Sequence, residues 1–414
     1  MKKRVNISVI ILVFLFILYA GSRLRKNEKV EPESFQFEVP PYAEIGLFDA
    51  GTQSLKIEND KPLEITIWYP AFGDGSQNKE IIYPYEVKLG KPLGAVKIAS
   101  SAGKAIRNAA FDLSGNPYPL VVLSPGFSIG STAYAWLGEH LASYGFVVVA
   151  PEHQEHLNPE DQLWRSAITR PQDILALFSY LDEQVLPGGQ FEGLINTEVV
   201  AVIGHSYGGY TTLAAGGAQI DMTGLQSHCQ QAIEEEHSAA WICEILISHQ
   251  ADMAELAGQD PNSDDLWPAW ADPRVDAIVP IAGDAFFFGE VGLAEIDIPV
   301  MAIGGTADVD SPYLWGTHPS FEYSSGSRKT EVALIDAEHM LFTGQCEQVR
   351  WYLKFFTGEF CKDSNWEREY AHQITKHFTT AFLLAELKAD HDAAAVLSSE
   401  IFDLNDVNFQ SEGY

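Results

Sequence analysis

The chain has 414 residues, 46% of them hydrophobic, and carries 57 acidic against 26 basic side chains, for a formal net charge of -31. So large an excess of negative charge repels nucleic-acid phosphates and anionic lipid headgroups, which excludes a nucleic-acid partner. The hydrophobic content suffices for one large core or two modest ones.

The first residues are typical of an export signal. Lys2, Lys3 and Arg4 precede an uninterrupted apolar stretch, VIILVFLFILYA, at residues 9–20. No polar residue interrupts this stretch, so it lacks the polar, solvent-facing side that a helix packed on a soluble core has. We therefore predict a signal peptide or membrane anchor over residues 1–24 and an exported protein, whose membrane contact would run through this segment.

The next boundaries follow from composition. Residues 25–43 are polar and proline-bearing, and we predict a linker there. The main domain is expected over residues 44–396, opening with the strand LEITIWYPA at 63–71. Residues 397–414 are predicted to be a frayed tail.

Six short apolar runs predict strands of a central sheet. The runs are continuous rather than alternating, as strands covered on both faces require. They are YPLVVLS (118–124), GFVVVAP (145–151), EVVAVIG (198–204), VDAIVPIAG (275–283), IPVMAIGG (298–305) and EVALID (331–336).

Helical segments lie between and after these runs. Residues 131–145 have a serine at the cap and a glycine at the end, and residues 170–184 place a proline in the first turn. Another helix is predicted within residues 362–396. Strands that alternate with helices predict an α/β fold with a mostly parallel sheet of about eight strands, flanked by helices.

The four cysteines form two local pairs in the sequence, Cys229 with Cys243 and Cys346 with Cys361. In an oxidising compartment, each disulfide would stabilise the fold by about 3 kcal/mol on the loop-entropy model. No Cys-x-x-Cys spacing occurs, so the sequence predicts no zinc site and no other metal.

Ser206 is the candidate nucleophile. It lies in GHSYG at residues 204–208, where the buried run 198–204 ends and a helical segment starts. A sharp strand-to-helix turn lifts the serine hydroxyl above the sheet, and the flanking glycines allow strand and helix to approach closely. The helix N-terminus at the same point favours developing negative charge.

A serine hydroxyl needs a base, and His339 is the candidate. It follows the last apolar run, in a loop expected at the carboxyl edge of the sheet, where open α/β sheets carry their sites. His153 and His156 also follow a strand and are rivals. The acid that orients the histidine should follow a strand too; Asp308 is the first candidate, with Asp284 and Asp310 as alternatives.

The oxyanion of an acyl-transfer reaction needs backbone donors. One is expected from the amide of Tyr207, directly after the serine, and the other from the loop LSPGFSIG at 123–130. Gly126 permits a tight turn there, and the amide of Phe127 is the second candidate. An ordinary Pro-Gly turn is the alternative interpretation.

Taken in order, the segments ITIWYPA, LSPGFS, HLASYGFVVVAPEH, RPQDILALFSYLD, GHSYGG, VPIAGDAFFFG, IPVMAIGGTADVDSP and AEHMLFTGQC resemble the dienelactone-hydrolase-like and platelet-activating-factor acetylhydrolase-like group of serine α/β-hydrolases. The resemblance covers roughly residues 45–385. It implies the α/β-hydrolase fold, the chain order serine, acid, histidine, which disfavours His153 and His156, and ester hydrolysis without a metal or organic cofactor.

The resemblance leaves two points open. Platelet-activating-factor acetylhydrolases have their acid in a segment like AGDAFFFG, which would nominate Asp284. The dienelactone-hydrolase-like bacterial members and related polyester hydrolases have it in a segment like GGTAD, which nominates Asp308. This sequence contains both segments. Dienelactone hydrolases proper use a cysteine nucleophile, so lactone opening is not implied here.

About 60 residues, 216–274, separate the helix after Ser206 from the next strand. Insertions at this point in α/β-hydrolases usually form a lid over the site. Trp241, Trp267 and Trp270 could line an acyl pocket, or equally could pack the insertion onto the core.

These patterns predict a carboxylic ester hydrolase that works through Ser206, Asp308 and His339, with oxyanion donors at Phe127 and Tyr207 and no cofactor. The substrate is expected to be a small-molecule or lipid ester, of the short-chain or phospholipid type, such as the 1-alkyl-2-acetylglycerophosphocholine that the resemblance suggests. Two other classes stay open: a peptidase or amidase on the same fold, and a catalytically silent binding protein.

Overall fold

The computed structural model describes residues 39–58, 62–73, 80–261, 263, 265–346, 349, 358–361, 363, 365–398 and 405–414. The signal peptide or anchor predicted over residues 1–24 lies outside the described residues, as does most of the linker predicted over 25–43. At the end of that linker, residues 41–43 form a short 3-10 helix, η1 (Pro41–Ala43), and the Tyr42 amide donates to His377 Nδ1 over 3.3 Å. These last residues are therefore packed on the domain.

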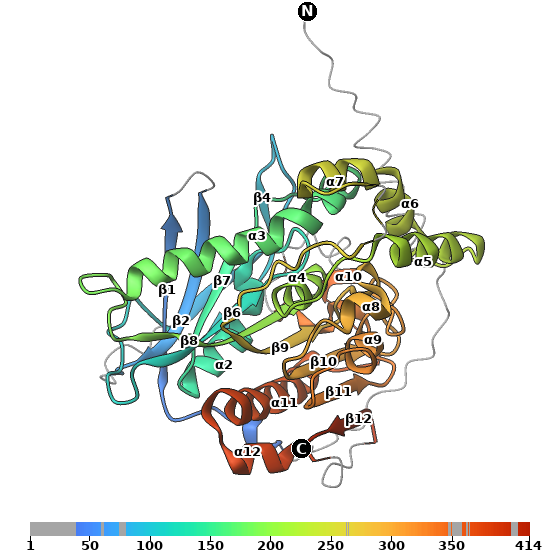
Figure 1. The fold of residues 1–414 in the computed structure, drawn as a ribbon. Helices are drawn as coiled ribbons and strands as arrows, with labels where there is room; N and C mark the ends of the chain where they lie inside the picture. The colour runs from blue at the N-terminus through green and yellow to red at the C-terminus, as the bar shows by residue number, and fades with distance from the viewer. Residues whose placement is uncertain are drawn as a thin grey trace, which may run out of the picture. The chain divides into compact units, whose positions relative to one another are not determined.

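A ten-stranded sheet forms the centre of the described residues (Figure 1). Its strands run in the order β12-β11-β10-β9-β8-β6-β7-β2-β1-β5, and the stretch from β11 to β7 is parallel. The strands are β1 (Asp49–Ile57), β2 (Leu63–Ala71), β5 (Ile106–Arg107), β6 (Tyr118–Ser124), β7 (Val147–Glu152), β8 (Ile195–His205), β9 (Val275–Ile281), β10 (Val300–Gly305), β11 (Lys329–Leu334) and β12 (Val407–Glu412). A separate antiparallel hairpin pairs β3 (Ile81–Lys88) with β4 (Ala95–Gly103).

Helices cover both faces of the sheet (Figure 1). Helices α3 and α4 pack on one face with the larger core cluster, and α2 and α11 pack on the other face with the second. The helices are η2 (Ser131–Tyr134), α2 (Ala135–Ser143), α3 (Pro159–Val185), α4 (Tyr207–Ala215), α5 (Met222–Glu234), α6 (Ala240–Ser248), α7 (Gln250–Ala257), η3 (Ala285–Phe287), α8 (Gly289–Leu293), α9 (Thr317–Glu322), η4 (His339–Phe342), α10 (Gly358–Cys361), α11 (Arg368–Lys388) and α12 (His391–Val396). The predicted α/β-hydrolase fold is confirmed.

Each of the six apolar runs between residues 118 and 336 contains a strand, because each is buried on both faces. The sheet has ten strands rather than about eight, since the short β5 joins one edge and β12 the other. The frayed tail expected over 397–414 is wrong for residues 407–412, which pair antiparallel with β11 along their whole length. Alternating polar residues hid this edge strand.

Helix α3 also starts earlier than predicted. Its first residue is Pro159, followed by Glu160 and Asp161 in the first turn, and Pro171 lies inside the helix rather than at its start. A proline at the first helical position and acidic residues next to it both favour a helix start at this point. The polar first turns lack the apolar periodicity that marks the rest of the helix.

The insertion over residues 216–274 consists of α5, α6, α7 and the segment that leads to β9. A disulfide between Cys229 and Cys243 joins α5 to α6, and the second predicted pair, Cys346 with Cys361, is also bonded. Trp267 is buried in the core, whereas Trp241 is 41% exposed. Trp267 therefore packs the insertion onto the core, and a lid over the site stays a prediction.

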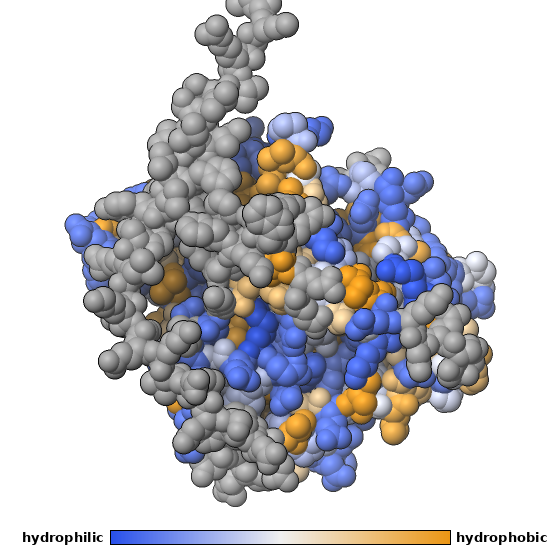
Figure 2. All heavy atoms as spheres, turned by 180° about the vertical axis from the view of Figure 1, so that it is seen from behind, coloured by the Kyte–Doolittle hydropathy of each residue, from blue (hydrophilic) through white to orange (hydrophobic). Residues whose placement is uncertain are grey.

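On the face seen in Figure 2, hydrophilic residues predominate and hydrophobic ones form small scattered groups where the described residues are visible. Single exposed apolar side chains of this kind are normal for a globular domain. None of the helices in the part of the chain described above is both long and apolar enough to span a bilayer.

Candidate active site

Ser206 lies at the sharp turn between β8 and α4. Its backbone has φ 59° and ψ -126°, a conformation that is costly for any residue with a side chain. The surrounding structure holds it there: the Ser206 amide donates to the carbonyl of Ile281 over 2.9 Å. The serine is partly exposed at the carboxyl end of β8, which is the strand–serine–helix turn that the sequence predicted.

Glycines make this turn possible. A Cβ atom on Gly204 would lie 2.2 Å from the carbonyl oxygen of Gly208, and one on Gly208 would lie 2.0 Å from the carbonyl oxygen of Ser124. Gly209 packs equally closely on Gly283, with 2.4 Å from its ideal Cβ to the Gly283 Cα. Helix α4 therefore starts in direct contact with the ends of both neighbouring strands, β6 and β9.

The structure brings His339 and Asp308 to Ser206. His339 Nε2 lies 2.8 Å from Ser206 Oγ, and His339 Nδ1 lies 2.7 Å from Asp308 Oδ2. The other carboxylate oxygen of Asp308 accepts the amides of Asp310 and Ser311 at 2.9 and 2.8 Å, which fixes its orientation. With Nδ1–H donating to Asp308, the free Nε2 lone pair can accept the Ser206 proton. We call these three residues the Ser206 set.

Asp284, the alternative acid, faces elsewhere. Its carboxylate accepts the Ser311 hydroxyl at 2.7 Å. Burial raises the pKa of Asp284 to about 7, although the Ser311 hydrogen bond and the charge of His339 oppose this. Asp308, and not Asp284, is thus the carboxylate in contact with His339.

Carboxylates dominate the electrostatics around His339. Burial, the largest single influence, would lower its pKa, but the charge and hydrogen bond of Asp308 together with the charges of Asp310 and Asp284 outweigh burial, and the pKa of His339 rises to about 9. An imidazole in this setting is well suited to carry a positive charge during a reaction.

The two residues whose amides are the candidate oxyanion donors contact each other through their side chains. The rings of Phe127 and Tyr207 meet edge to face, with centroids 5.9 Å apart. Within the described residues, neither the Phe127 amide nor the Tyr207 amide has a hydrogen-bond partner, while the amides on either side of Phe127, those of Gly126 and Ser128, donate to Tyr134 and Glu155. Two free N–H groups beside a serine hydroxyl can hold an anionic oxygen.

His205 is a residue of this site that sequence reasoning missed. Its Nε2 lies 3.0 Å from the carbonyl of His339, and its Nδ1 lies 2.9 Å from the Tyr134 hydroxyl. Burial, together with the nearby His339, lowers the pKa of His205 well below the ordinary value, so its ring is neutral. A histidine at the end of an otherwise apolar strand, next to Ser206, was the available signal.

The rival His153 forms a second set of similar geometry. Its Nε2 lies 3.0 Å from Ser124 Oγ, and its Nδ1 lies 2.8 Å from Asp173 Oδ2. We call Ser124, His153 and Asp173 the Ser124 set. The other rival, His156, lies 4.0 Å from Asp161. Neither rival contacts Ser206 in the described structure.

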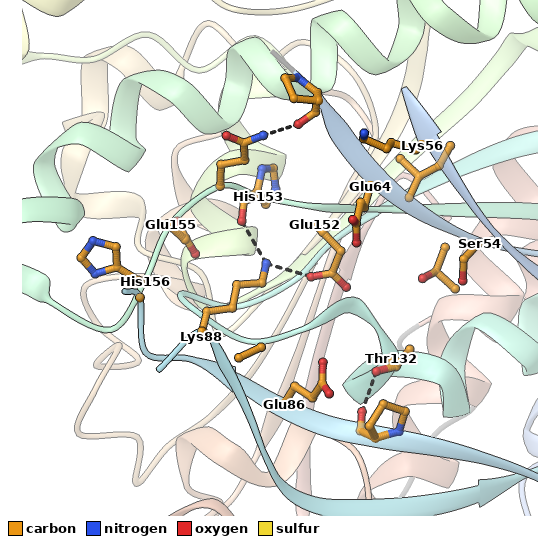
Figure 3. A pocket seen from close by; sticks show the side chains of 18 of the residues that line it. Ser54, Lys56, Glu64, Glu86, Lys88, Thr132, Glu152, His153, Glu155 and His156 are labelled. Carbon is orange, nitrogen blue, oxygen red and sulfur yellow. Dashed lines mark hydrogen bonds and ion pairs between the residues drawn. The ribbon is translucent and has the colours of Figure 1, made fainter. Parts of the chain in front are cut away.

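A cavity of about 1190 Å³ opens beyond β7, lined by β1, β2, β3 and the loop after β7 (Figure 3). Lys88 lies between Glu152, at 2.8 Å, and the carbonyl of His153, at 2.9 Å. The described residues that line the cavity include none of the Ser206 set. Among the described residues, the cavity thus touches the Ser124 set at His153 and is not lined by Ser206.

Part of this sequence is similar to known proteins. A family model described as chlorophyllase matches residues 91–226, a segment that includes Phe127, Ser206 and Tyr207. A cutinase from Thermobifida alba is 31% identical over 107 residues, which are 26% of this chain and 33% of the cutinase.

A cutinase from Thermobifida fusca shares 31% identity over the same length, and a bis(hydroxyethyl) terephthalate hydrolase from Streptomyces coelicolor is 34% identical over 102 residues, 29% of its own length. The chain thus spans about a third of the length of the curated relatives it matches. The specific resemblance to the dienelactone-hydrolase-like and platelet-activating-factor acetylhydrolase-like group finds no counterpart among these matches. Together with the fold, the matches support a serine α/β-hydrolase.

Proposed function

We propose that the chain is a carboxylic ester hydrolase in which Ser206 is the nucleophile, His339 the general base and Asp308 the orienting acid. The observation that carries the proposal is the hydrogen-bonded Ser206 set, whose serine occupies a strained backbone conformation at the carboxyl edge of the sheet. Backbone strain of this kind persists only where the surroundings impose it, and it is common at catalytic residues.

The reaction proceeds in two steps through an acyl-enzyme. His339 accepts the Ser206 proton as Oγ attacks the ester carbonyl, and the amides of Phe127 and Tyr207 hold the resulting oxyanion. His339 then gives the proton to the leaving alcohol. A water molecule attacks the acyl-enzyme by the same proton transfers and releases the carboxylic acid and free Ser206.

Esters are favoured over peptide amides because the named relatives are cutinases and a bis(hydroxyethyl) terephthalate hydrolase. The position of the contacting acid in GGTAD, Asp308, matches the dienelactone-hydrolase-like and polyester-hydrolase pattern rather than that of the platelet-activating-factor acetylhydrolases. We therefore favour a short-chain ester over a phospholipid as the substrate. The two disulfides support export to an oxidising compartment.

The test is labelling with a fluorophosphonate probe together with hydrolysis of p-nitrophenyl esters from acetate to laurate. Wild type should react with the probe and turn over the short esters fastest, and Ser206→Ala should do neither. Folded wild type that neither reacts with the probe nor hydrolyses any ester would leave the binding-protein alternative. Turnover of peptide amides in preference to esters would identify a peptidase.

A further inference from the structure

The loop that carries Phe127 is held from its buried side by one cation. Arg170, on α3, is 1% exposed. Its Nη2 donates to the carbonyl of Pro125 at 2.6 Å and to that of Gly126 at 3.3 Å. Its Nη1 lies 3.4 Å from the hydroxyl of Thr211 on α4. Arg170 thus connects the loop after β6 to the helix that begins at Ser206.

This contact determines where the Phe127 amide points. The carbonyl of Gly126 and the N–H of Phe127 belong to one planar trans peptide, so they point in opposite directions. The carbonyl is held by Arg170 and also accepts the Ile129 amide at 3.1 Å. With its carbonyl held on the buried side, this peptide must direct the Phe127 N–H away from Arg170.

The charge of Arg170 is balanced by Glu155. Arg170 Nε lies 3.2 Å from Glu155 Oε2, and Glu155 accepts the Ser128 amide at 2.6 Å and the Ser166 hydroxyl at 2.8 Å. Burial opposes ionisation of Glu155, but Arg170, with His153, Lys88 and the Ser128 amide, outweighs it and lowers the pKa of Glu155. The buried pair therefore stays ionised, and it fixes the peptides on both sides of Phe127.

Arg170 also lies beneath the second donor. Its guanidinium carbon is 5.6 Å from the centroid of the Tyr207 ring. The Tyr207 hydroxyl donates to the carbonyl of Leu163, about two turns earlier on the same helix as Arg170. Both residues whose amides are proposed to hold the oxyanion therefore rest on this part of α3.

We propose that Arg170 is a positioning residue of the oxyanion-binding site, which directs the Phe127 amide at the oxyanion and, through its charge on the Gly126 carbonyl, makes that amide a stronger donor. The inference rests on the proposed function, since it assigns Arg170 a part in the same reaction. A cation at the carbonyl end of a peptide polarises it toward more positive charge at the N–H, and a buried site transmits this effect with little screening. Arg170 touches no reacting atom and acts through the loop.

The test compares variants in the full chain. Arg170→Met alone would leave Glu155 charged and unpaired in the interior, which destabilises the fold for a reason unrelated to catalysis. The double variant Arg170→Met/Glu155→Gln removes both charges and keeps an oxygen that can accept the Ser128 amide. Arg170→Lys keeps the charge but cannot contact both carbonyls and Glu155 in the same geometry. Arg274→Met is the matched control, because Arg274 pairs with Asp272 and Asp182 at a distance from the loop.

Four quantities are measured on each variant: kcat and KM for p-nitrophenyl butyrate, the inhibition constant of an alkylboronic acid, and the thermal unfolding midpoint. The boronic acid forms a tetrahedral adduct on Ser206 whose oxygen occupies the oxyanion position. In the double variant, kcat should fall about 100-fold with KM nearly unchanged, as for loss of one oxyanion donor. The affinity of the double variant for the boronic acid should fall in parallel with kcat. Arg170→Lys should have a kcat and a boronate affinity between those of wild type and the double variant. Arg274→Met should match wild type in both quantities.

A double variant that unfolds at the wild-type temperature and keeps wild-type kcat and boronate affinity would overturn the inference. If the double variant does not fold, the kcat of Arg170→Lys tests the inference instead. We expect this kcat to be about tenfold below that of wild type, and an unchanged kcat would overturn the inference equally. Wild type that hydrolyses no ester and binds no boronate would instead overturn the proposed function, so the two failures are distinguishable.

Discussion

The Ser206 set and the Ser124 set contain the same three residue types with almost the same hydrogen bonds, yet they differ in every property that matters for catalysis. Serine to histidine is 2.8 Å in the Ser206 set and 3.0 Å in the Ser124 set, and histidine to aspartate is 2.7 and 2.8 Å. The distances alone would not tell which serine is the nucleophile.

The difference lies in backbone, exposure and charge. Ser206 is partly exposed and has a positive φ, whereas Ser124 is fully buried at the end of β6. Burial, with the charge of Arg170 next, lowers the pKa of His153, while three carboxylates raise that of His339 to about 9. The Ser124 set joins the end of β6 to the segment after β7 and to α3. On the proposed function, a hydrogen-bonded Ser–His–Asp arrangement acts as a site only where a substrate can reach the serine and a cation is stabilised.

The largest expected effect comes from removing each serine hydroxyl in turn. Ser206→Ala should lower kcat by about 10⁶-fold, because the nucleophile is lost and only oxyanion binding remains. Ser124→Ala should keep kcat within about threefold. Ester hydrolysis and fluorophosphonate labelling of both variants check this, and loss of labelling in Ser124→Ala alone would reverse the assignment.

Substitution of the aspartate in each set should produce a smaller difference in kcat between the two sets than substitution of the serine. Asp308→Asn should lower kcat by about 10⁴-fold, since an amide favours the wrong tautomer of His339. Asp173→Asn should leave kcat within tenfold and reduce the free energy of unfolding by about 1 kcal/mol, the value of a typical hydrogen bond. Kinetics and urea denaturation of both variants measure the two effects; equal losses of kcat would show that the sets are functionally linked.

The pH dependence of activity should follow His339 and not His153. Because the pKa of His339 is about 9, the ring is largely protonated at lower pH and cannot accept the serine proton. The ratio kcat/KM should therefore rise with pH and level off above about pH 9. The folded pKa is raised above the ordinary 6.5, so the stability that His339 contributes is present below pH 6.5 and lost as pH rises through about 9. A kcat/KM profile that is flat above pH 6 would contradict the raised pKa.

The smallest expected effect concerns Asp284, whose charge adds to that of Asp308 at His339. Asp284→Asn should move the rising limb of the pH profile to lower pH, by less than one pH unit, and change the plateau kcat by less than about tenfold. The matched comparison is Asp308→Asn, in which the plateau itself collapses. If Asp284→Asn lowers the plateau as strongly as Asp308→Asn, Asp284 is the orienting acid.

Much of the fold could be predicted because it depends on local patterns. Each parallel strand was a continuous apolar run, and both disulfides joined cysteines that are near neighbours in the sequence. Strand β12 was missed because an edge strand with one exposed face carries polar residues at every second position. The start of α3 was missed because its first turn is polar.

The site was predictable only in part, for a different reason. Ser206 was marked by its strand–turn–helix context, but Asp308 and Asp284 both follow strands at the same edge, and only the tertiary structure decides which carboxylate meets His339. The contacts of Arg170 and Glu155 join segments that no local pattern links. What distinguishes this pair is that both charges are buried, a feature that is rare unless the charges are paired and that only the folded structure shows.

Strand β12 also bears on how the protein behaves at high concentration. Without it, β11 would be the outermost strand and would offer a row of unpaired N–H and C=O groups, flanked by Val332 and Leu334, to any other extended chain. The outer strand instead exposes Asn408, Gln410 and Glu412, while Phe409 packs against Phe378. A few polar residues far in sequence from Ser206 thus give the outer edge of the sheet a more polar strand than β11, and polar edge strands are poorer templates for edge-to-edge aggregation.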